Sequence, residues 1–163
     1  MSELISKLTS YNLFNYLFPG VVFIAFLNNS TNYIITDDNI FILAFLSYFI
    51  GLVISRIGSV IIEPLFRKIK IINFKEYKDF IEASKVDEKL EVLSEQNNVF
   101  RTIISMFLII ILVKVYSNIS IYYNLCNFDF YIIYVILLII FILAYRKQTN
   151  YITSRIEKVL SKK

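Results

Sequence analysis

Four long stretches of the chain contain no charged residue, and they constrain the fold more than any other feature. The four stretches are Ser10–Thr36, Asn39–Ser55, Thr102–Val113 and Phe130–Tyr145. A helix needs roughly 20 apolar residues to cross the hydrocarbon core of a bilayer. Apolar residues make up 57% of the 163 residues and charged residues 18%, against about 45–50% and about 25% in soluble domains. We therefore predict an all-α, polytopic membrane protein with four transmembrane helices.

The charge-free stretches also divide the chain. The predicted spans cover approximately residues 11–28, 39–62, 101–121 and 128–145. The chain then has an N-terminal pair of spans, an insert, a second pair and a tail, at residues 1–66, 67–100, 101–145 and 146–163. Pro19-Gly20 interrupts the first span, so a kinked or re-entrant helix is the alternative there to a straight one.

The distribution of Lys and Arg orients the chain, because cytoplasmic loops of membrane proteins carry an excess of both. Neither residue occurs at 28–39 or 117–129, whereas the insert with its flanks, the tail and the N-terminus hold 15 of the 17. We therefore expect a multi-pass protein of the inner (plasma) membrane with both termini in the cytoplasm. The tail combines six basic residues with apolar ones at helical spacing, which predicts a basic amphipathic helix on the inner leaflet.

Apolar residues recur at helical spacing within the insert. Tyr77, Phe80 and Ile81 predict one apolar helix face, and Leu90 and Leu93 predict a second. With a stop at Asn97-Asn98, the two segments predict a cytoplasmic helical hairpin between the second and third spans. The hairpin either caps the bundle or docks a cytosolic partner. Eight acidic residues balance eight basic ones from Glu63 to Arg101, which argues against nucleic acid as a partner.

Small residues recur every four positions along the second span, at Ser47, Gly51, Ser55 and Ser59. Such a stripe lets two helix backbones approach closely, and its hydroxyls can donate hydrogen bonds across the contact. The stripe packs either within the bundle or against another copy of the chain, and both readings stay open.

Apart from Arg101 and Asp129 at the ends of the predicted spans, Arg56 and Lys114 are the only charged residues inside them. A charge within a membrane marks a functional site unless its side chain reaches the headgroups. Arg56 is expected near the inner boundary and Lys114 in the outer third of its span. Each side chain either snorkels to the headgroups or faces a cavity.

The composition leaves little from which to build a catalytic site. The chain has no His and one Cys, and metal sites and catalytic triads draw heavily on these residues. It also lacks a Gly-rich phosphate loop and paired acidic residues within a span. We therefore expect a non-enzymatic protein with no cofactor and no metal site.

The outline of four spans with a modest cytosolic insert resembles the small membrane effectors and sensors of bacterial antiphage defence. The resemblance implies a protein that alters membrane permeability or packing when a cytosolic partner signals. Its expected partners are the lipid bilayer, further copies of itself and a cytosolic protein. Two alternatives stay open: a non-conducting membrane anchor or assembly subunit for a cytosolic complex, and a small-solute or ion transporter.

Overall fold

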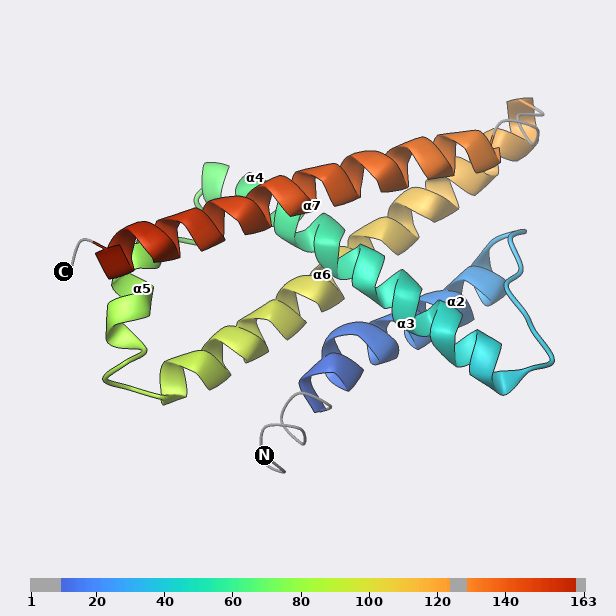
Figure 1. The fold of residues 1–163 in the computed structure, drawn as a ribbon. Coiled ribbons are helices and arrows are strands. Elements are labelled where there is room, and N and C mark those ends of the chain that lie inside the picture. The colour runs from blue at the N-terminus through green and yellow to red at the C-terminus, as the bar shows by residue number, and fades with distance from the viewer. Residues whose placement is uncertain (1–9, 124–128, 161–163) are drawn as a thin grey trace.

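The computed structural model describes residues 10–123 and 129–160, which form helices and their connections (Figure 1). No strand occurs in these residues, so the all-α class is confirmed. Two elements, η1 and η2, are single wide turns of π-helix. The elements in chain order are η1 (Leu13–Leu17), α2 (Phe18–Ser30), α3 (Ile40–Ile57), η2 (Gly58–Ile62), α4 (Glu63–Lys68), α5 (Tyr77–Ala83), α6 (Lys89–Tyr123) and α7 (Asp129–Leu160).

Four helical stretches in the described part of the chain are long and apolar enough to cross a membrane. They are Ser10–Ser30, Ile40–Lys68, Lys89–Ser120 and Val135–Glu157. This confirms the prediction of four candidate spans, and the fold is compatible with a multi-pass membrane protein. Figure 1 shows α5 and the C-terminal end of α7 at one end of the molecule, with the connection between α2 and α3 at the other.

The third and fourth helices extend further than the hydropathy pattern predicted. α6 begins at Lys89, about three turns before the expected span, and it passes through Asn97 and Asn98 without a break. The expected stop there is wrong, because the weak helix propensity of Asn is readily overridden by its surroundings. α7 continues to Leu160, so the described part of the basic tail extends the fourth helix.

The insert is arranged differently from the expected hairpin. α5 is a helix of seven residues whose Tyr77 ring centroid lies 4.8 Å from that of Tyr151 in α7. The second predicted segment of the insert is the start of α6, where the Asp87 carboxylate accepts a hydrogen bond of 3.0 Å from the Lys89 amide. A hairpin of two short helices packed on each other is therefore not confirmed, since α5 packs chiefly on α7.

A wide turn precedes the proline in each of the first two spans. Pro19 lacks an amide hydrogen, and its ring crowds the carbonyl group four residues earlier. The π turn η1 ends two residues before Pro19, and the helix then continues to Ser30. Likewise η2 ends two residues before Pro64, and the helix continues to Lys68. Pro64 therefore does not end the second helix.

The bundle core lies between the first three spans. Phe23, Leu27, Ile54 and Met106 form its buried apolar cluster. α7 is the least buried of the four candidate spans, and it contacts the core side of the bundle through α3 and η2. The second span therefore contacts each of the other three candidate spans.

Candidate functional site

A buried carboxylate lies at the end of the second span. The Glu63 side chain is only 7% exposed, and Glu63 begins α4 directly after the wide turn η2. Residues four apart in an α-helix turn by about 400°, so a stripe at this spacing drifts around the helix. A π turn takes more residues per revolution than an α turn. The turn η2 thereby reduces this drift, so Glu63 lies on the same inward-facing side of the second span as Ser47.

Three cations from three helices surround this carboxylate. Arg67 lies one turn along α4 and places Nη2 3.0 Å from Glu63 Oε1. Arg101 of α6 donates from Nη1 to Glu63 Oε2 at 2.6 Å. Lys147 of α7 places Nζ 3.3 Å from Oε1. These four residues, which we call the Glu63 cluster, carry one negative and three positive charges.

Lys147 joins the fourth helix to the second through further hydrogen bonds. Its ammonium group donates to the Ser59 carbonyl oxygen at 2.6 Å and to Ser59 Oγ at 2.9 Å. Together with Glu63, these acceptors use all three hydrogens of the ammonium group. The Lys147 Nζ also lies 5.8 Å from the centroid of the Tyr151 ring, which in turn contacts Tyr77. The cluster is thus connected to α5 through α7.

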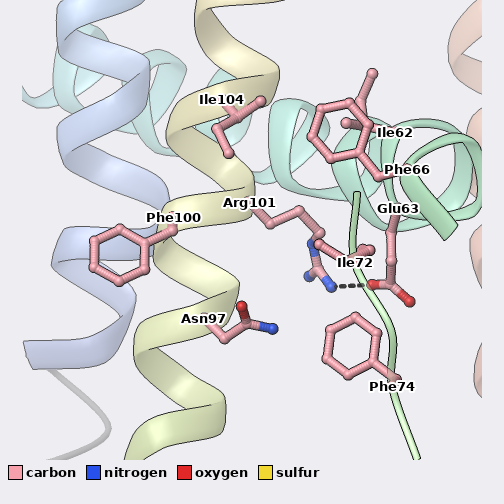
Figure 2. A pocket seen from close by; sticks show the side chains of 9 residues that line it. All are labelled: Ile62, Glu63, Phe66, Ile72, Phe74, Asn97, Phe100, Arg101 and Ile104. Carbon is pink, nitrogen blue, oxygen red and sulfur yellow. Dashed lines mark hydrogen bonds and ion pairs between the residues drawn. The ribbon is translucent and has the colours of Figure 1, made fainter. Parts of the chain in front are cut away.

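A small cavity of about 70 Å³ adjoins the ion pair between Glu63 and Arg101. Figure 2 shows these two side chains pointing toward each other, Arg101 from α6 and Glu63 from α4. The cavity walls are otherwise mostly apolar, and its other lining residues are Ile62, Phe66, Ile72, Phe74, Asn97, Phe100 and Ile104. The Nε of Arg101 is buried and meets no acceptor in the described part of the chain.

A second group of buried polar side chains lies deeper in the bundle. Thr102 of α6 is fully buried and Asn15 of η1 is 1% exposed. The Thr102 hydroxyl lies 2.8 Å from Asn15 Oδ1 and 3.1 Å from Ser55 Oγ, and Asn15 Nδ2 donates to Ser55 Oγ at 3.4 Å. Because buried polar groups are stable only when they are hydrogen-bonded, this network holds the first three spans in one register.

The small-residue stripe packs within the chain. Ser47, Gly51 and Ser55 are buried. A Cβ built on Gly51 would overlap the carbonyl oxygen of Tyr16, and one built on Gly20 would overlap that of Ser47. The backbones of the first two spans therefore touch at two glycines. Ser59, the last residue of the stripe, accepts hydrogen bonds from Lys147.

The two predicted intramembrane charges do not belong to the cluster. Arg56 is half-buried on α3 and Lys114 is exposed on α6. Within residues 10–123 and 129–160, no carboxylate forms an ion pair with either. Lys114 consequently faces outward from the single chain. A path lined by Lys114, which the transporter alternative needs, would require a second chain.

The predicted insert face is split between two environments. Tyr77 and Phe80 are half-buried and Ile81 is buried, so these three residues form the packed face of α5. Leu90 is half-buried at the start of α6, and Leu93 is 56% exposed. The structure therefore does not bring the five residues together into one surface.

Sequence reasoning missed the Glu63 cluster. It counted Glu63, Arg67 and Arg101 only among the balanced charges of the cytoplasmic insert and its flanks, and Lys147 among those of the basic tail. One signal pointed to part of the cluster, since the four-residue spacing of the stripe continues from Ser59 to Glu63 and Arg67. Nothing comparable marks Arg101 or Lys147, because their contribution depends on how α6 and α7 are rotated.

The cluster can hold charge and attract anions. Within the described residues, no three His, Cys, Asp or Glu side chains lie together so that they could hold a metal ion. Breaking a buried ion pair from one side costs much more than the pair contributes, because it leaves an uncompensated charge. The cluster therefore favours one arrangement of α4, α6 and α7, and loss of one of its buried charges would weaken that arrangement.

Comparison with known proteins identifies no relative. No protein-family model matches the chain, and the searches of curated proteins and of solved structures find no match either.

Proposed function

We propose that this chain is a non-enzymatic membrane protein whose copies assemble in the inner membrane and change their packing or permeability on a cytosolic signal. The observation that carries the proposal is the Glu63 cluster, in which one buried carboxylate of α4 joins that helix to α6 and α7. In this role the cluster is a latch that holds the resting arrangement. A bistable element biased by charge is the usual basis of such switches.

A route for the signal supports the proposal. α5 packs on α7 through Tyr77 and Tyr151, and Tyr151 lies one turn beyond Lys147 on the same helix. A partner that displaces α5 would therefore move the part of α7 that carries Lys147. Loss of the Lys147 hydrogen bonds would free α7 from Ser59 and Glu63, while Arg67 and Arg101 still neutralise the carboxylate.

The direct test is dye or ion release from liposomes that contain the full chain. We expect Lys147→Gln to release the vesicle contents several-fold faster than the wild type when no signal is present. Arg146→Gln is the matched control, since it removes the neighbouring, exposed charge on the same helix. Equal release rates from Lys147→Gln and wild-type vesicles would contradict the proposal, and so would a protein that is monomeric in nanodiscs.

A membrane anchor for a cytosolic complex is the second candidate. It is favoured by three apolar side chains that are exposed at the α5 end of the molecule: Phe74 at 43%, Val86 at 90% and Leu93 at 56%. If the chain is an anchor, vesicles that contain Lys147→Gln retain their contents as well as wild-type vesicles do. Leu93→Ser and Val86→Ser then reduce recovery of the cytosolic complex with the tagged protein, and Lys114→Ala does not.

The resemblance to antiphage effectors suggests the biological setting of the first candidate. A latch variant with increased permeability should slow the growth of cells that express it, whereas the wild type should do so only after phage infection. Growth curves and plaque counts of cells that carry wild type, Lys147→Gln or Arg146→Gln measure both effects. Equal growth and equal plaque counts in all three would remove the defence role.

A further inference from the structure

We propose that the Glu63 cluster binds the phosphate group of an anionic phospholipid. The inference rests on the proposed function only in placing the cluster at a membrane surface. It depends on three observations: an excess of positive charge, an apolar cavity beside it, and the position of the cluster along the helices.

The charge of the cluster is not balanced within it. Arg67, Arg101 and Lys147 share a single carboxylate, so two positive charges remain. The Arg67 side chain is 48% exposed, and its guanidinium carbon lies 4.6 Å from the centroid of the Phe74 ring. An exposed guanidinium held against an aromatic ring is well placed to donate paired hydrogen bonds to a phosphate.

The cavity beside the ion pair suits a ligand that is both charged and apolar. Its walls include Phe66 and Phe100, while Arg101 lines it with a buried Nε that meets no acceptor in the described chain (Figure 2). A buried donor without an acceptor destabilises the fold, because it has lost its hydrogen bonds to water. A phosphate oxygen close to this guanidinium would remove that cost, and the glycerol or acyl carbons of a lipid would cover the apolar wall.

The position of the cluster along the helices matches the headgroup layer. Glu63 lies 23 residues after Ile40, the first residue of α3, which is about 35 Å of helix at about 1.5 Å per residue. Lys147 lies 18 residues after Asp129, the first residue of α7, or about 27 Å of helix. The hydrocarbon core is about 30 Å thick. Counted from these helix starts, the two distances bracket the core thickness and put the cluster at the boundary with the headgroup layer, where basic pockets between helices suit anionic headgroups.

Lipid retention by the purified full chain tests the proposal. Native mass spectrometry in detergent compares phosphatidylglycerol with phosphatidylcholine of the same acyl chains, and a third arm supplies inorganic phosphate. We expect wild type to retain phosphatidylglycerol preferentially. Arg67→Gln should weaken this retention about tenfold, the effect of losing one charge-assisted hydrogen bond of about 1.5 kcal/mol or more. Arg155→Gln, an exposed charge on α7, is the control.

Three outcomes would overturn the proposal. They are equal retention of the two lipids, an equal loss of retention in Arg67→Gln and Arg155→Gln, and retention of inorganic phosphate that matches that of phosphatidylglycerol. The second outcome indicates general attraction to basic residues, and the third a soluble ligand. Because Arg67 is half exposed, its replacement is compatible with folding, which a thermal unfolding curve of the same sample checks. Retention requires no ion flux, so its failure is distinguishable from failure of the latch.

Discussion

Lys147 Nζ lies 3.3 Å from Glu63 Oε1, although 84 residues separate the two in the sequence. This contact joins the last candidate span to the end of the second. Glu63 is 7% exposed and Lys147 25%, so water screens the pair only in part. The arrangement of the fourth helix therefore depends on few contacts, this ion pair among them, because α7 buries less of its surface than any other candidate span.

Replacing the carboxylate should destabilise the fold. Glu63→Gln leaves three cations without a counter-charge, and we expect the free energy of unfolding to fall by about 3 kcal/mol, the lower end of the range for breaking a buried pair. Unfolding in mixed micelles, followed by circular dichroism, measures the change. Glu91→Gln, which neutralises an exposed carboxylate on α6, should have almost no effect. If the two variants unfold alike, the cluster contributes nothing to stability.

The helices were predictable from local patterns, whereas their contacts were not. The charge-free run Phe130–Tyr145 predicts a span in any context, because the cost of exposing apolar residues depends only on composition. The pairing of Lys147 with Glu63 depends on the rotation of α7 against α3, which hydropathy leaves open. Asn97 and Asn98 show the same limit. Their propensity favours a stop, yet the Asn98 carbonyl oxygen lies 2.9 Å from the Thr102 hydroxyl within a continuous α6.

Removing the Thr102 hydroxyl should loosen the register of the first three spans. Thr102→Val keeps the shape of the side chain but leaves Asn15 Oδ1 without its hydrogen bond of 2.8 Å. We expect a loss of about 1 kcal/mol, since hydrogen bonds between membrane helices average near 0.6 and reach about 1.7 kcal/mol. The same micelle titration measures it. Thr149→Val is the control, because the Thr149 hydroxyl is exposed and bonds only within its own helix.

The stripe of small residues was recognised from its spacing, and only its partner was left open. In the structure that partner is the first span of the same chain, since Tyr16 and Gly20 meet the stripe. The spacing identifies a face of one helix, but it contains no information about which helix covers it. Continuation of the spacing to Glu63 was visible in the same way. That Glu63 belongs to a buried cluster of charges became clear only from the positions of Arg101 and Lys147 in the structure.

A single methyl group on the stripe should separate the first two spans. Gly51→Ala places a Cβ against the Tyr16 carbonyl oxygen, and backbone atoms cannot move aside as a flexible side chain can. We expect a loss of about 1–3 kcal/mol, the usual cost of overpacking. Ala44→Val adds volume at an exposed position of α3 and should leave the unfolding midpoint unchanged. A stable Gly51→Ala variant would contradict the close contact of the two backbones.

Loss of the Tyr151 ring should release α5 from α7. The rings of Tyr77 and Tyr151 are 4.8 Å apart, and an aromatic pair contributes about 0.5–1.5 kcal/mol beyond its buried area. Tyr151→Ala should therefore raise the hydrogen exchange of the Tyr77–Ala83 amides by up to about tenfold. Ile152→Ala, which truncates a side chain that is 52% exposed, should leave that exchange unchanged. Unaltered exchange in Tyr151→Ala, with faster exchange in Leu90→Ala, would instead indicate that α5 packs on α6, as in the predicted hairpin.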